Sequence, residues 1–426
     1  MCYFLRFLSL LSFSVLFIAG CDSGPADPPS EEPPPVEVEP LTSFDNAVLE
    51  VGQFLIAVDS TSSVGFAGAA AYWSDMEHPN RKVFVIYESG LWIAAESNGT
   101  HYANILCGCG TGWGSNYTRA LTSTGQQAGI FVVTSDSLSS DKEWPSELGA
   151  PTDASGQPMT YGDKMLWGAF TSKVSNTALR ANPLRDIRLS QSIYGYDALH
   201  YSDLVFVRYE LTNNGNEAMD GIYLGYRSDT DLSVLAGTDI LDRMETRNNV
   251  VAYDAGNELS YTYFAADTAN ARPDTRTYVT GYTLLGVDDV GGLLSHRVLR
   301  KNDYIDGEAF GEDGLVDPEN VYNALRGLSS TGESMVNPVT GSPDLFAFSG
   351  DPVARTGWLD RAVEQSGGID IRQLLTAGPF SLAPGETRSV TIAWAVGAGS
   401  GLSGALADLK QNIRLARETS SLWDFE

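Results

Sequence analysis

Short runs of β-branched and aromatic residues recur along the chain from about residue 43 onward, and each is bounded by Gly, Ser, Asn or Asp. Runs of this length and composition predict β-strands. Clear cases are residues 82–87, 129–133, 204–211, 221–226 and 390–396. Many short strands with frequent glycine turns favour antiparallel sheets over a βαβ architecture. The pattern therefore predicts a mainly β protein with one or two antiparallel β-sandwich domains.

A strong turn signal separates two of these runs. The apolar run at 204–211 stops just before Asn214-Gly215, and the run at 221–226 follows. An Asn-Gly pair supplies the positive φ that a tight hairpin turn needs. The sequence thus predicts that these two strands form a hairpin.

A helical period replaces the strand pattern near the end of the chain. Residues 402–418 place leucine and isoleucine at helical spacing, and Ser400 or Ser403 is placed to cap the start. We predict a terminal helix that packs on the sandwich, and a shorter helix at 318–327. Polar, small residues near position 180 suggest a boundary between an N-terminal β domain (43–190) and a C-terminal β-sandwich domain with the helix (191–426).

The first twenty residues have the composition of a secretory signal. They contain one basic residue, Arg6, and an apolar core at 8–18. A bilayer-spanning helix needs ~20 apolar residues, so this core is too short to span. Cys21 follows directly, and its thiol is the group that a lipoprotein signal offers for acylation. We predict a signal peptide at 1–20 and a lipidated Cys21; an ordinary signal peptide and a transmembrane anchor are the alternatives.

Residues 21–42 are rich in proline and acid and contain few large apolar residues. Such a segment cannot bury enough surface to offset its ordering entropy, and its prolines favour an extended chain. We predict a disordered linker that holds the folded part away from a membrane. The predicted location is the cell envelope, at the outer membrane or cell surface, with the membrane contacted through the lipid on Cys21.

The charge balance excludes some partners. The chain has 54 acidic residues against 27 basic ones, a formal net charge of −27. This surplus argues against nucleic acid and against anionic headgroups as partners. It is compatible with calcium, which prefers several hard oxygen ligands. Our candidate ligands are Asp229, Asp231, Asp239 and Asp242, because alternate acids on a loop share one side; a solvated acidic loop is the other interpretation.

Motifs for catalysis are missing from the sequence. It contains no nucleophile elbow, P-loop, dinucleotide fingerprint or HExxH. The four histidines are scattered, and the Cys107 and Cys109 pair lacks further zinc ligands nearby. Eight tryptophans are present, most of them in apolar runs, so core packing is the expected role. We therefore expect a protein that is not an enzyme.

Four stretches carry a resemblance to a known group. They lie at 89–99, 144–167, 348–360 and 375–387, and the most specific are Gly149-Ala150-Pro151-Thr152-Asp153 and Phe348-Ser349-Gly350-Asp351-Pro352. Over roughly residues 45–415 the chain resembles large secreted, β-rich surface proteins of Bacteroidota and neighbouring phyla, many of which end in a type IX secretion sorting domain. The resemblance implies a surface location and a β-rich body, and it brings no catalytic residues.

These observations predict a lipid-anchored envelope protein with a structural or binding role. A glycan or an envelope protein is the expected partner. One alternative is a glycan-binding lipoprotein for polysaccharide capture, which predicts a row of exposed aromatic side chains. The other is a secreted hydrolase, which needs converging carboxylates or a His beside a Ser.

Overall fold

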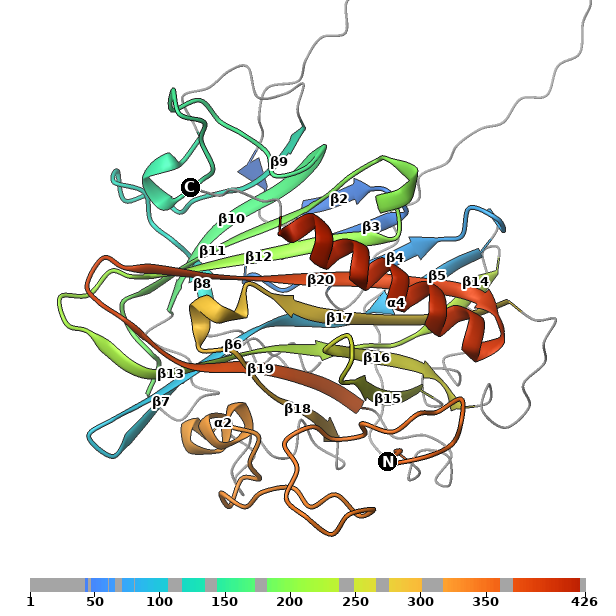
Figure 1. The fold of residues 1–426 in the computed structure, drawn as a ribbon. Helices are drawn as coiled ribbons and strands as arrows, with labels where there is room; N and C mark the ends of the chain where they lie inside the picture. The colour runs from blue at the N-terminus through green and yellow to red at the C-terminus, as the bar shows by residue number, and fades with distance from the viewer. Residues whose placement is uncertain are drawn as a thin grey trace, which may run out of the picture. The chain divides into compact units, whose positions relative to one another are not determined.

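The computed structural model of the chain describes residues 43–44, 47–59, 61–65, 71–79, 81–105, 117–134, 144–172, 182–236, 249–265, 276–300, 317–360 and 371–421. They belong to a unit that spans residues 39–426. Antiparallel strands dominate this unit, and its described part has two α-helices, one of them C-terminal, so the predicted mainly β fold is confirmed (Figure 1). Neither of these helices is long and apolar enough to cross a bilayer.

The largest sheet has ten strands, and all its pairings are antiparallel. Its order is β1 (Ser43–Phe44), β9 (Ile130–Thr134), β10 (Lys164–Ser172), β11 (Ile187–Gly195), β12 (Leu204–Asn213), β20 (Thr387–Ser400), β17 (Arg276–Leu285), β16 (Leu259–Phe264) and β15 (Asn249–Asp254), and β8 (Tyr117–Arg119) pairs with β10.

Two sheets of five strands accompany it. The first runs β18 (Leu293–Arg300), β19 (Ile371–Leu382), β13 (Met219–Asp229), β6 (Glu88–Ser97) and β7 (Thr100–Asn104). The second runs β14 (Ser233–Ala236), β5 (Arg81–Ile86), β4 (Ala71–Ser74), β3 (Phe54–Val58) and β2 (Ala47–Val51). The helices are α2 (Pro318–Leu325) and α4 (Gly401–Ser420), close to the predicted helices at 318–327 and 402–418.

The main core draws apolar side chains from the ten-stranded sheet and from both smaller sheets. Strand β20 illustrates why: Ile392 and Trp394 belong to this core, whereas Ala393 and Ala395 belong to the cluster beneath α4. Successive side chains of a strand point to opposite faces, so one strand serves both clusters. A strand buried on both faces needs the continuous apolar run that the sequence shows at 390–396.

The predicted hairpin at Asn214-Gly215 is wrong. Strand β12 pairs with β11 and β20, whereas β13 pairs with β19 and β6 in another sheet. The turn therefore carries the chain from one sheet to the next. The connection from β19 to β20 makes the same crossing in reverse, and the Asn213 side chain ties the two crossings through the Leu382 carbonyl at 3.0 Å.

Strands from both sides of residue 190 share the ten-stranded sheet. Strand β10 pairs with β11 from Lys164↔Gly195 to Thr171↔Arg188. The expected boundary at 190 therefore falls within β11 and does not separate one sheet from another.

Helix α4 lies along β20 and β17 (Figure 1). It approaches β20 at two glycines, because a Cβ on Gly397 would lie 2.3 Å from the Ala405 carbonyl oxygen and a Cβ on Gly399 would lie 2.6 Å from Gly404. The inner side of the helix, which includes Leu409 and Ile413, is buried. The close packing of α4 on these two glycines fixes the positions of its outward-facing residues relative to β15 and β16.

Candidate functional site

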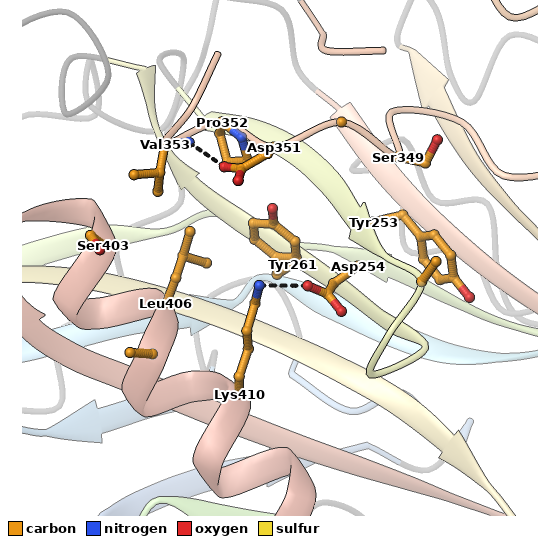
Figure 2. A pocket seen from close by; sticks show the side chains of 13 residues that line it. Tyr253, Asp254, Tyr261, Ser349, Asp351, Pro352, Val353, Ser403, Leu406 and Lys410 are labelled. Carbon is orange, nitrogen blue, oxygen red and sulfur yellow. Dashed lines mark hydrogen bonds and ion pairs between the residues drawn. The ribbon is translucent and has the colours of Figure 1, made fainter. Parts of the chain in front are cut away.

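A polar cavity of about 390 Å³ lies where α4 passes the β15–β16 hairpin and the segment 349–353 (Figure 2). We call it the α4 pocket. Its polar lining consists of Tyr253, Asp254, Tyr261, Ser349, Asp351, Ser403 and Lys410. Pockets for small ligands have roughly 300–1,000 Å³, so this one is large enough for a small molecule.

Asp254 and Lys410 form an ion pair on one side of the pocket. The Nζ atom of Lys410 lies 2.5 Å from Asp254 Oδ2, while Asp254 Oδ1 accepts the backbone and side-chain N–H groups of Asn257 at 2.8 and 2.9 Å. Burial alone would raise the pKa of Asp254, but the Lys410 ammonium and the Asn257 donors outweigh it and lower the pKa. This carboxyl group is therefore ionised near neutral pH and oriented by the protein.

Asp351 stands on the opposite side (Figure 2). Its Oδ1 atom accepts the backbone N–H groups of Val353 and Ala354 at 2.8 and 3.0 Å, which fixes the direction of the carboxylate. Among the described residues, no cation lies within ion-pair distance of it. The pocket thus contains one neutralised carboxylate and one carboxylate without a cationic partner in the described chain.

Tyr261 lies between these two acids (Figure 2). The residue is only 2 % exposed, yet it lines the pocket, and its hydroxyl makes no hydrogen bond with any described residue. Burial raises the pKa of Tyr261 far above its ordinary value, with smaller contributions from Tyr263, Asp254 and Asp351. The hydroxyl is therefore protonated, and it can both donate to and accept from a ligand.

An aromatic stack supports the same region. The Tyr253 ring lies between His296 and Phe346, with centroid separations of 5.2 and 4.8 Å. Leu406 adds an apolar surface beside the polar groups. The arrangement therefore offers hydrogen-bond donors, acceptors and a small apolar wall within one cavity.

The sequence identified this site only in part. Asp254 follows the last of the candidate calcium ligands, Asp242, along the chain, and Asp351 lies in a stretch that carries the family resemblance. Tyr261 and Lys410 were missed, because each sits in an ordinary strand or helix pattern. No local signal shows that these four residues, from three separate segments, meet.

Of the four candidate calcium ligands, only Asp229 and Asp231 lie within the described residues. Asp229 lies at the end of β13, is buried, and pairs with Arg372 at 2.9 Å and Arg227 at 3.8 Å. Asp239 and Asp242 lie outside the described residues, so the full calcium set remains a prediction. Within the described ranges, no group of three or more His, Cys, Asp or Glu residues is arranged to hold a metal.

One serine–histidine contact occurs, and it is buried. The Ser260 Oγ and His296 Nε2 atoms lie 2.9 Å apart, and His296 Nδ1 lies 2.8 Å from the Ala347 carbonyl oxygen. Both residues are 0 % exposed. Burial lowers the pKa of His296 to about 4, with the Ala347 carbonyl opposing the shift. A buried hydroxyl offers a substrate no access, so this pair is part of the polar interior.

The predicted row of exposed aromatic side chains is not found in the described ranges. Trp358 is half-buried, and the other described tryptophans, Trp73, Trp92, Trp144, Trp167 and Trp394, are buried. The large exposed apolar residues are all aliphatic or methionine. Cys21, Cys107 and Cys109 lie outside the described residues.

Comparison with known proteins finds no matching family model and no matching curated protein. Among solved structures, a putative aldose 1-epimerase from Escherichia coli K12 shares 10 % identity, with a TM-score of 0.31 over 84 % of this chain and 99 % of that one. A putative kojibiose phosphorylase from the human microbiome shares 8 % identity, with a TM-score of 0.33 over 89 % of this chain and 33 % of that one. A GH36 α-galactosidase from Geobacillus stearothermophilus shares 8 % identity, with a TM-score of 0.28 over 85 % of this chain and 42 % of that one.

These neighbours contradict the prediction that the chain is not an enzyme, because all three carry the names of enzymes that act on sugars. We withdraw that prediction. TM-scores of 0.28 to 0.33 transfer no activity to this chain, and it spans well under half of two of the three structures. We therefore infer a function from the α4 pocket alone.

Proposed function

We propose that the chain is a cell-envelope protein that binds a saccharide in the α4 pocket and is anchored through a lipid on Cys21. The observation that carries the binding site is the Tyr261 hydroxyl. Tyr261 is only 2 % exposed. Its hydroxyl lines the cavity and makes no hydrogen bond with the described residues. A polar atom placed in this way calls for a partner from solvent or ligand.

A sugar suits the groups around Tyr261. Each sugar hydroxyl donates one hydrogen bond and accepts others, so it needs both kinds of partner. Asp351 accepts, Lys410 donates, and Tyr261 does both. The C–H face of a sugar ring can contact Leu406, which lines the same cavity. A purely apolar ligand would leave these polar groups desolvated and unpaired, at a cost of ~1–3 kcal/mol each.

The test is binding to a panel of mono- and disaccharides, measured by calorimetry on the purified chain, with analysis of the sugar afterwards for any product. Tyr261→Phe removes one oxygen and keeps the ring. One neutral hydrogen bond is worth ~1 kcal/mol, so we expect roughly fivefold weaker binding.

Tyr223→Phe is the matched control, because Tyr223 is a half-buried strand tyrosine that does not line the pocket. It should bind as the parent does. No binding to any sugar in the panel, or equal affinities for the parent and Tyr261→Phe, would contradict the proposal.

A further inference from the structure

We infer that the α4 pocket selects its saccharide by charge, preferring a sugar that carries a protonated amine over a neutral one and rejecting an acidic one. The inference rests on the proposed saccharide site. It adds the chemical class of the ligand, and Asp351 is the residue that decides it.

The charges that line the pocket do not balance. Asp254 is neutralised by Lys410 at 2.5 Å, which leaves Asp351 as the remaining charge in the lining. The next ion pair along α4, Arg417 with Glu258 at 2.8 Å, cancels within itself. The pocket therefore has a surplus of one negative charge.

The carboxylate of Asp351 is positioned for an incoming donor. Two backbone N–H groups bind its Oδ1 atom, so Oδ2 is left to receive a ligand. An ammonium group can donate up to three hydrogen bonds, and Tyr261, which lines the same space, can accept one of them. A sugar amine would thus meet a charged acceptor and a neutral one together.

The rest of the chain favours the same choice. Its formal net charge of −27 disfavours the approach of anionic ligands. A uronic, sulfated or phosphorylated sugar would bring a second negative charge beside Asp351 without a described cation to balance it. A protonated amine is attracted both by the net negative charge of the chain and by the carboxylate of Asp351.

The magnitude is modest, because the pocket is open to solvent. Exposed ion pairs contribute up to about 1 kcal/mol, so the amino sugar should bind roughly fivefold more tightly than its neutral counterpart. Raising the salt concentration to ~1 M shortens the Debye length to ~3 Å, and most of this preference should then be lost.

The experiment compares four probes at mildly acidic pH, where amines are protonated. They are the β-1,4-linked glucosamine dimer, its N-acetylated form, cellobiose and glucuronic acid. The parent chain should bind the glucosamine dimer most tightly and glucuronic acid least. Asp351→Asn keeps the oxygen that accepts the Val353 and Ala354 N–H groups, and it should equalise the amine and N-acetyl forms while retaining cellobiose.

Asp153→Asn is the matched control. Asp153 caps a similar turn, with Oδ1 accepting from Ser155 and Gln157, but it lies outside the pocket. It should leave the preference unchanged. Equal binding of the amine, N-acetyl and neutral dimers by the parent chain would overturn the charge inference and leave saccharide binding standing. Failure of all four probes, together with the wider panel, would overturn the proposed function itself.

Discussion

Asn213 holds together the two places where the chain crosses between sheets, and its replacement by alanine should destabilise the fold. Its Oδ1 accepts the Gly215 N–H at 2.8 Å, and its Nδ2 donates to the carbonyl oxygens of Glu217 at 2.8 Å and Leu382 at 3.0 Å. The side chain is 0 % exposed.

The loss can be sized from these contacts. Three hydrogen bonds at ~1 kcal/mol each give about 3 kcal/mol, and the loss at Leu382 leaves a carbonyl on a buried residue. That is a large share of the ~5–15 kcal/mol by which domains are stable. The sequence pattern treats Asn213 as an ordinary turn residue, for which alanine would cost little.

Equilibrium unfolding in urea measures this difference. Asn213→Ala should lower the midpoint without changing the slope, because the native surface stays the same. The control is Asn214→Ala next to it, where the exposed side chain makes no described hydrogen bond and the change should stay within ~0.5 kcal/mol. A loss below 1 kcal/mol for Asn213→Ala, or an equal loss for both variants, would refute the reasoning about the crossings.

Three further results are expected. The buried His296 has a pKa lowered from 6.5 to about 4, so the unfolded chain binds more protons between these values and stability falls by about 3 kcal/mol as the pH drops through this window. His296→Asn should remove this loss from the dependence of stability on pH. Asp203→Asn is the comparison, because the pKa of Asp203 is raised to about 6 and its removal should change the pH dependence in the opposite direction. An unchanged pH dependence of His296→Asn would count against the buried neutral imidazole. Cys21→Ser should yield an unlipidated, unanchored but folded protein, and fatty-acid labelling of that variant would refute the anchor. Dialysis against a chelator should lower the melting midpoint if calcium binds at Asp229, Asp231, Asp239 and Asp242, and an unchanged midpoint would remove the calcium prediction.

The sequence pattern predicted those helices and strands whose formation depends on residues close together in the chain. Helix α4 was predicted at 402–418 and found at Gly401–Ser420, because its buried side repeats every three to four residues. The short helix α2 was also predicted, and Asp317 caps it by accepting the Glu319 N–H at 3.0 Å. Strands such as β12 and β20 were visible because β-branched and aromatic residues fit a pleated, buried surface.

Pairing between strands was beyond the reach of that pattern. The Asn214-Gly215 pair matches the sequence preference of a hairpin turn, but neither residue adopts a positive φ. Strand β12 pairs instead with β20, almost two hundred residues later in the chain. A turn fixes the direction of the backbone, whereas the sheet that a strand joins depends on which apolar face is available across the core. The same reason explains why the expected boundary at residue 190 falls inside the ten-stranded sheet.

By itself, the sequence determined the mainly β character, the terminal helix and the acidic surface, because these depend on composition and on spacing between near neighbours. Tertiary structure alone decided the site. Tyr261 comes from a strand, Asp351 from a turn and Lys410 from a helix, and their meeting depends on how closely α4 is seated on Gly397 and Gly399. Contacts between residues so far apart in the chain are set by packing of whole elements, and no local spacing in the sequence records them.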